Sequence, residues 1–146
     1  MAIASLIVWI LTAGGGAFML AKWVRGGGHR ASTASSLPPA VVFGHFVLAA
    51  VGLVLWIVYV ITDNHAIGWI GLALLAPVAI LGFVMVARWA SARRAGSMAG
   101  QPTTAPGSQL QDAPERSFPV AVVVAHGVLA VATIVLALLA LSEIGG

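Results

Sequence analysis

Four long runs of apolar residues, separated by polar segments, dominate the pattern of this 146-residue chain. As a helix rising about 1.5 Å per residue, each run is long enough to cross about 30 Å of hydrocarbon. The apolar positions fill every side of these helices, whereas a surface helix of a soluble domain carries them in one stripe. The predicted spans are Ile3–Lys22, Ala40–Ile61, Ile67–Trp89 and Phe118–Leu141.

The composition points to the same class of protein. Hydrophobic residues make up 60% of the chain and charged residues 8%, which is typical of polytopic membrane proteins. We therefore expect an all-α membrane protein in which residues 1–146 form a single transmembrane domain. This domain is expected to be a bundle of four transmembrane helices in the lipid bilayer. A segment rich in Pro, Gly and Thr, about residues 95–116, is expected to form a flexible cytoplasmic loop.

All the basic residues fall on one side of this four-span arrangement. The positive-inside rule then places both basic loops in the cytoplasm and both termini outside, in a bacterial-type plasma membrane. Because topology accounts for the net charge of +3, no nucleic-acid partner is expected. An alternative role for two of these arginines, Arg93 and Arg94, is to bind the headgroups of anionic lipids. The basic residues are Lys22, Arg25, Arg30, Arg88, Arg93, Arg94 and Arg116.

Two stretches of the chain recur later in the sequence, each at its own offset. Gly16–Trp23 aligns with Gly82–Trp89, 66 positions later (88 − 22), and the sequence that begins at His45 aligns with that at His126, 81 positions later (126 − 45). Both halves run in the same direction through the membrane. The pattern therefore predicts two tandem helical hairpins related by a pseudo-two-fold axis along the membrane normal.

His45 and His126 are the most informative residues, because each places an ionisable ring inside an apolar span. Such residues are costly in hydrocarbon and usually mark a functional site. They lie six residues past Pro39 and seven past Pro119, roughly 9–10 Å from the cytoplasmic boundary. In a sequentially connected bundle the second and fourth helices lie on a diagonal, with axes about 13 Å apart. That spacing suits two imidazoles with one iron between them.

Small residues surround both histidines, either on the same helical face or next to them in the sequence. They offer clearance for a flat macrocycle, although close packing of membrane helices uses the same residue types. The chain has no cysteine, which excludes thiolate metal sites and covalently attached c-type haem. The small residues are Gly44, Ala49 and Gly52 near His45, and Ala125, Gly127, Ala130 and Thr133 near His126.

In the positions of His45 and His126 the chain resembles the four-helix transmembrane b-type cytochromes, in which histidines of the second and fourth helices clamp a haem. The resemblance implies haem b, one bis-histidine group near the cytoplasmic face, and a role in electron relay or in handling haem or gas. It also implies a quinone or a redox protein as partner, with any catalysis on quinone or oxygen species belonging to the cofactor. Members with two haems carry a second histidine pair where this chain has Tyr59 and Ala140, so transfer across the whole membrane is not implied.

Other interpretations stay open at this point. Met19 and Met85 are related by the repeat, and with the histidine pair they could form a soft site for Cu(I) or serve two haems, one per repeat. A transporter of copper, another metal or a small solute would use the pair as ligands or proton relays. A structural subunit of a larger complex would use the histidines only for hydrogen bonds to a carbonyl or to Thr133. A homo-oligomer is compatible with each of these.

Overall fold

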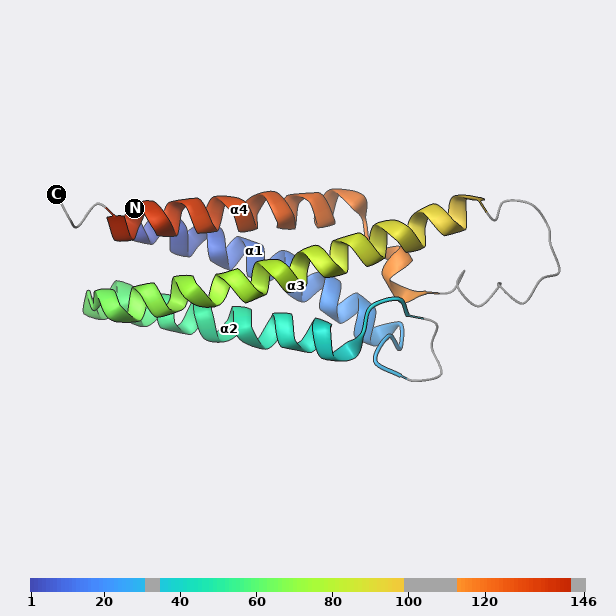
Figure 1. The fold of residues 1–146 in the computed structure, drawn as a ribbon, viewed down its shortest axis with the longest axis horizontal. Helices are drawn as coiled ribbons and strands as arrows, with labels where there is room; N and C mark the ends of the chain where they lie inside the picture. Colours follow the sequence, from blue (N-terminus) through green and yellow to red (C-terminus); the bar gives the residue numbers. More distant parts are fainter. Residues whose placement is uncertain (31–34, 99–112, 143–146) are drawn as a thin grey trace.

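The computed structural model describes residues 1–30, 35–98 and 113–142, and these form an antiparallel helical bundle (Figure 1). The long helices are α1 (Ala2–Arg25), α2 (Pro39–Thr62), α3 (His65–Met98) and α4 (Val120–Ser142), and a short 3-10 helix, η2 (Pro114–Ser117), precedes α4. Each long helix is long and apolar enough to cross a membrane. The four predicted spans are therefore confirmed as helices of this kind.

Local sequence explains where the helices begin and end. Helix α2 begins at Pro39, a residue whose fixed φ suits the first turn and whose missing N–H is not needed there. It ends at Asp63, which adopts a left-handed φ of 52°, and the side chain of Asn64 then accepts a hydrogen bond from the Ala66 amide (3.1 Å) at the start of α3. This two-residue connection makes α2 and α3 a tight hairpin.

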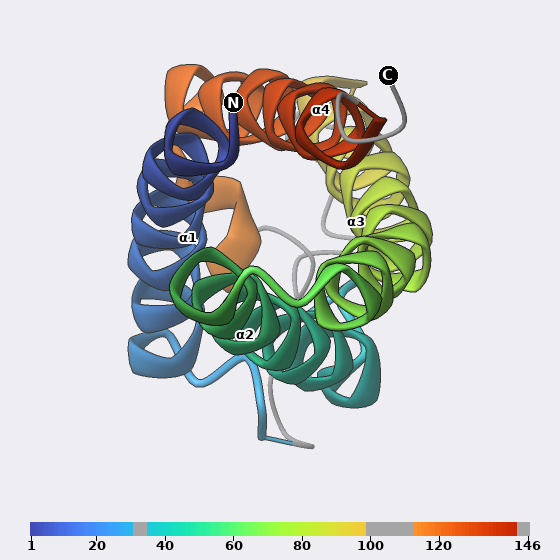
Figure 2. The same cartoon turned by 90° about the vertical axis from the view of Figure 1, so that its left-hand side faces the viewer.

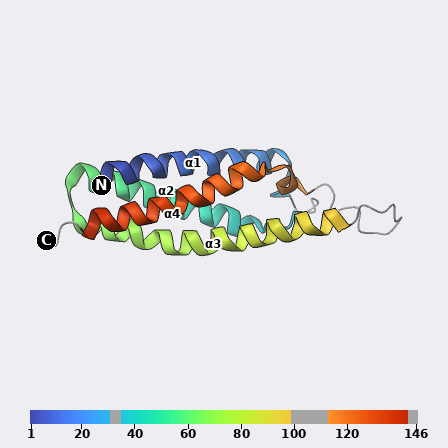
Figure 3. The same ribbon diagram turned by 90° about the horizontal axis from the view of Figure 1, so that it is seen from above.

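Helix α3 continues nine residues past Trp89, the predicted end of the third span (98 − 89). The added residues include Ala90, Ala92 and two arginines, all of which have high helix propensity. The segment as a whole is less apolar than the span before it. The helix therefore extends beyond the apolar part of the bundle, as Figure 3 shows. Most of the predicted loop, residues 99–112, lies outside the described residues.

The four long helices follow one another around the bundle in chain order (Figure 2). Helices α2 and α4 consequently lie on a diagonal, which confirms the placement predicted for the two histidine-bearing helices. Packing is most extensive between α2 and α3 and between α1 and α4, and much less extensive at the α1–α2 and α3–α4 boundaries. The bundle thus consists of two closely packed helix pairs.

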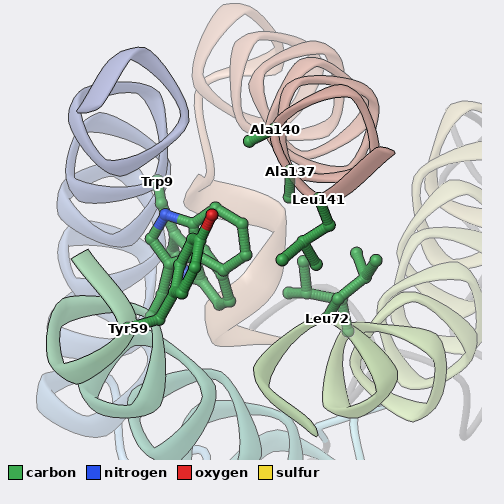
Figure 4. Close-up of a cluster of buried hydrophobic side chains, with 8 residues drawn as sticks. Trp9, Tyr59, Leu72, Ala137, Ala140 and Leu141 are labelled. Atoms are coloured by element: carbon green, nitrogen blue, oxygen red, sulfur yellow. The ribbon is translucent and has the colours of Figure 1, made fainter. Parts of the chain in front are cut away.

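The start of α1 and the end of α4 lie at one end of the bundle (Figure 1), here called the termini end. Lys22 and Arg25, in the last turn of α1, lie at the other end, the basic end, as does Arg88, which donates to the Ser36 carbonyl just before α2. A hydrophobic cluster fills the core toward the termini end (Figure 4), with the Trp56 ring centroid 6.0 Å from that of Trp9 and 4.9 Å from that of Tyr59. Tyr59 and Ala140 both belong to this packed cluster. Its buried members are Trp9, Trp56, Tyr59, Leu72, Leu75, Ala137, Ala140 and Leu141.

A second cluster closes the basic end, built on Trp23, Leu37, Val42 and Phe118. Between the two clusters lie the histidines. The outer surface of the bundle is apolar, with side chains such as Ile61 and Phe83 exposed over 76% and 74% of their area. Such a surface is unfavourable in water and suits contact with lipid.

The basic end is held together by a buried carboxylate that the sequence analysis did not single out. Glu115 in η2 is fully buried and accepts hydrogen bonds from the Ser35 hydroxyl (3.0 Å) and from the Ser36 hydroxyl (2.7 Å) and amide. The Trp89 indole donates to the Glu115 carbonyl oxygen (3.1 Å). Glu115 therefore joins the α1–α2 connection to the segment that leads into α4.

Candidate functional site: the histidine pair

The rings of His45 and His126 lie close together between the diagonal helices α2 and α4. Their centroids are 6.2 Å apart and their planes are inclined by 56°. Both side chains are half-buried. The fold thus brings together the two residues that the sequence analysis placed first, although 81 positions separate them (126 − 45).

Each ring is hydrogen-bonded through Nδ1 to a backbone carbonyl of the helix that packs most closely on its own. His45 Nδ1 lies 2.9 Å from the Val78 carbonyl oxygen in α3, and His126 Nδ1 lies 2.9 Å from the Thr12 carbonyl oxygen in α1. Because a carbonyl oxygen can only accept, Nδ1 is the donor in both rings. In the neutral ring the lone pair is then on Nε2, the nitrogen available to a metal.

Two glycines allow the rings to reach these carbonyls. A Cβ added to Gly16 would lie 3.0 Å from Cε1 of His126, and one added to Gly82 would lie 3.4 Å from Cε1 of His45. Each glycine comes four residues after the carbonyl-bearing residue, Thr12 or Val78, and so lies one helical turn further along the same face. A methyl group at Gly16 would press on the His126 ring, whereas one at Gly82 would come just into contact with the His45 ring.

No hydrogen-bond partner is found for Nε2 of either ring among residues 1–30, 35–98 and 113–142. In that same part of the chain, every fully enclosed side-chain nitrogen or oxygen has a partner. Neither Nε2 is therefore fully enclosed by protein atoms. An acceptor nitrogen without a partner is unfavourable in a hydrocarbon environment, so both Nε2 atoms are suited to a bound ligand.

Of the small residues predicted beside His45, Ala49 and Gly52 share its inward face, and Gly44 lies next to it in the sequence. Ala49 is half-buried and Gly52 is buried, and a Cβ on Gly52 would lie 3.2 Å from the Trp9 ring. A Cβ on Gly44 would meet only the Leu81 side chain, at 3.8 Å. Gly52 and Gly44 therefore lie in contacts between helices.

The residues predicted beside His126 fall into two groups. Ala130 is half-buried and Thr133 is buried on the inward face of α4, where the Thr133 hydroxyl lies 3.4 Å from that of Thr12. Ala125 and Gly127 are exposed, and no atom lies within 4 Å of a Cβ added to Gly127. These two residues lie on the outward side of α4, because flanking residues in a helix point about 100° to either side of His126.

Met19 and Met85 are half-buried and pack against the cluster at the basic end. This is a gap-filling environment for methionine. No group of three or more His, Cys, Asp or Glu side chains suited to a metal ion occurs within the described ranges. A site at the histidine pair therefore offers two imidazoles as its nitrogen ligands.

Hydrogen bonds from the histidines to a carbonyl were among the expectations from the sequence, but the two residues that supply the carbonyls were not predicted. Backbone oxygens carry no residue signature, and Thr12 and Val78 differ in side chain. Their positions are nevertheless 66 apart (78 − 12), the offset already seen between the first and third spans, so the repeat is the signal that could have found them.

Comparison with known proteins adds no relative. No protein-family model matches the sequence, and no match is found among curated proteins or among solved structures. The geometry of the histidine pair is the observation from which a function can be inferred.

Proposed function

We propose that this chain is an integral membrane protein that holds one haem b between His45 and His126. The observation that carries this proposal is the 6.2 Å separation of two ring centroids on diagonal helices. Two imidazoles bonded to one metal through nitrogens about 2 Å from it have ring centroids about 6 Å apart. The separation thus fits a metal held from both sides.

The number of ligands favours haem over a bare ion. A porphyrin supplies four nitrogens to its iron and needs only axial ligands from the protein. His45 and His126 fit that requirement, and no cluster of three or more metal-ligating side chains occurs in the described part of the chain. When bound, such a group supplies one-electron chemistry.

The Nδ1 hydrogen bonds fit the same role. A histidine that binds a metal through one nitrogen usually donates the other N–H to a carbonyl or carboxylate, which fixes the ring and raises its basicity. Val78 and Thr12 provide such acceptors for His45 and His126. A purely structural pair would make the same two bonds, but it would leave each Nε2 unpaired in hydrocarbon.

Repeat-related contacts support a pseudo-two-fold arrangement of the ligands. Lys22 donates to the Ser117 carbonyl (2.9 Å), and Arg88, 66 positions after Lys22, donates to the Ser36 carbonyl (3.2 Å), 81 positions before Ser117. The histidine–carbonyl bonds obey the same two offsets. Two halves related in this way present their histidines at the same depth, as one shared group requires.

The charges support an orientation with the basic end in the cytoplasm, by the positive-inside rule. The haem would then lie in the cytoplasmic half of the membrane. The cluster around Trp56 and Tyr59 fills the core toward the termini end with packed side chains, which favours one haem rather than two. We therefore propose an electron relay that exchanges electrons with a quinone or with a cytoplasmic redox protein.

The experiment is to purify the protein in detergent from haem-replete cells and to measure haem per chain, together with metal content. We expect about one haem per chain, with most of it lost in His45→Ala combined with His126→Ala. His65→Ala is the matched control. His65 lies at the start of α3 beside Tyr59, at the termini end of the bundle, so its replacement should leave haem content unchanged. A colourless protein containing copper would overturn haem in favour of a Cu(I) site.

A further inference from the structure

We infer that the edge of the basic end between α1 and α4 binds the headgroup of an anionic phospholipid, such as phosphatidylglycerol, through Lys22 and Arg25. This inference rests on the membrane insertion in the proposed function and not on the haem. It differs from lipid recognition by Arg93 and Arg94, which the sequence alone suggested, because it places the site on a different pair of helices.

The side chain of Lys22 is held in place at this edge. Its Nζ donates to the Ser117 carbonyl oxygen (2.9 Å), just before α4, and lies 5.7 Å from the centroid of the Phe18 ring. Phe18 is exposed over 47% of its area and belongs to the apolar outer surface that suits contact with lipid. The ammonium group is therefore fixed where polar headgroups meet acyl chains.

This ammonium group has donors left for an anion. It carries three N–H groups, and the bond to Ser117 uses one of them. In the described part of the chain, Lys22 forms no ion pair with a carboxylate. The acidic residue described at this end, Glu115, is fully buried and accepts from Ser35 and Ser36 instead. The phosphate of a lipid headgroup can accept the remaining N–H groups of Lys22.

Arg25 adds a second cation on the same face of α1. It follows Lys22 by three residues, whereas Phe18 and Leu11 precede Lys22 by four and by eleven, so all four residues lie along one stripe of the helix. Arg25 is exposed, and Leu11 is exposed over 57% of its area. The stripe thus offers apolar side chains for an acyl chain and, at its basic end, two positive charges for a headgroup. A soluble anion would use only the charges, whereas a phospholipid uses both parts.

The repeat-related edge between α2 and α3 lacks this combination. Arg88 corresponds to Lys22 there (22 + 66), but Ser91 takes the place of Arg25 (25 + 66). The Ser91 hydroxyl donates within α3, to a backbone carbonyl one turn earlier. On that face of α3 a headgroup would meet one cation instead of two, so we place the site between α1 and α4.

Two other exposed arginines, Arg30 and Arg94, provide a matched control. Both lie past the ends of the apolar runs, and Arg94 is in the part of α3 that extends beyond the bundle (Figure 3). At physiological ionic strength the Debye length is about 8 Å, so exposed charges beyond this distance from a headgroup are largely screened. Removing these two charges should therefore affect lipid binding much less than removing those of the site.

The test is to titrate the purified protein in an uncharged detergent with phosphatidylglycerol or phosphatidylcholine, and to measure bound lipid by native mass spectrometry. We expect the wild type to prefer phosphatidylglycerol. Lys22→Gln combined with Arg25→Gln should weaken its binding at least about fivefold, because one cation near a membrane surface is worth about that factor. Arg30→Gln combined with Arg94→Gln should weaken it less than about twofold. Equal effects of the two double variants, or no preference in the wild type, overturn the inference.

Further measurements separate this site from a folding effect and from binding of a soluble anion. Lys22→Arg combined with Arg25→Lys keeps both charges and should bind phosphatidylglycerol like the wild type, whereas a loss as large as that in the Gln pair overturns the inference. Glycerol phosphate carries the anionic group without acyl chains and should not displace the lipid, and displacement at equal concentration overturns a lipid site. A colourless protein that keeps the preference overturns the haem alone. A chain recovered outside the membrane fraction overturns both proposals.

Discussion

Gly16 lies directly against the ring of His126, and a Cβ at this position would come within 3.0 Å of Cε1. That distance is shorter than a normal carbon–carbon contact of about 3.5–4.0 Å, so the ring would have to move. Since the ring is also held by the Thr12 carbonyl at 2.9 Å, a shift of the ring lengthens and weakens that hydrogen bond. Gly16 is therefore a positioning residue for His126.

The first prediction concerns this glycine. Gly16→Ala should lower haem content several-fold, and Gly82→Ala should lower it less, because its Cβ would meet His45 at 3.4 Å rather than 3.0 Å. Gly14→Ala is the control, since nothing lies within 4 Å of its Cβ position, and it should leave haem content unchanged. Haem per chain is the readout. Equal values for Gly16→Ala and Gly14→Ala would contradict the prediction.

The second prediction concerns the stability of the α1–α4 pair. The Ser5 hydroxyl of α1 donates to the Thr133 carbonyl oxygen of α4 (3.3 Å), and Ser5→Ala removes this bond between the two helices. Interhelical hydrogen bonds of this kind in membranes are worth about 0.6–2 kcal/mol, and we expect a loss of that size in the free energy of unfolding. Thr62→Val removes a hydroxyl that bonds only within α2, to the Val58 carbonyl. This control should change stability less, as measured by unfolding in mixed micelles, and an equal loss would refute the interhelical contact.

The third prediction concerns Glu115. Replacing it with Ala leaves the buried donors of Ser35 and Ser36 without an acceptor, at a cost of about 1–3 kcal/mol. We expect faster hydrogen exchange of the Ser36 amide and unchanged absorption by the haem, because the histidines lie in other helices. Glu115→Gln should have a smaller effect, since one carbonyl oxygen remains. If the amide of Ser36 stayed equally protected in the Ala variant, the buried carboxylate would not be what holds this connection.

The fourth prediction concerns the number of haems. The cluster around Trp56 and Tyr59 fills the bundle toward the termini end, so the protein should bind one haem and no second group. Tyr59→Phe should leave haem content and spectrum unchanged, because Tyr59 belongs to that cluster and not to the site. Haem quantified against protein by amino-acid analysis checks this. A ratio near two, or a spectrum altered by Tyr59→Phe, would contradict it.

The large features of the fold follow from hydrophobicity, and the details of the site do not. Four apolar runs predicted the four helices, and sequential connection predicted that α2 and α4 lie on a diagonal. The end of α3 was missed, because the arginine- and alanine-containing segment after Trp89 is helical without being apolar. Hydropathy reports on lipid contact and not on helix propensity.

The sequence predicted that His45 and His126 face one another, and their ring centroids do lie 6.2 Å apart, but it did not predict how the small residues near them pack. Small residues serve helix contacts as well as cofactor clearance, so Gly52 lies against Trp9 and Gly127 lies on the outward side of α4. The acceptors of Thr12 and Val78 were missed because every residue has a backbone carbonyl. Burial of Glu115 was missed because it depends on how two connections meet at the basic end.

Electron paramagnetic resonance of the oxidised, purified protein tests the pairing of His45 and His126 most directly. With both imidazoles bound, the iron is six-coordinate, and we predict a low-spin ferric signal that becomes high-spin in His45→Ala. The account would be contradicted by a low-spin signal that persists in both His45→Ala and His126→Ala. Protein purified from haem-replete cells with no ferric signal and no porphyrin absorbance would also contradict it.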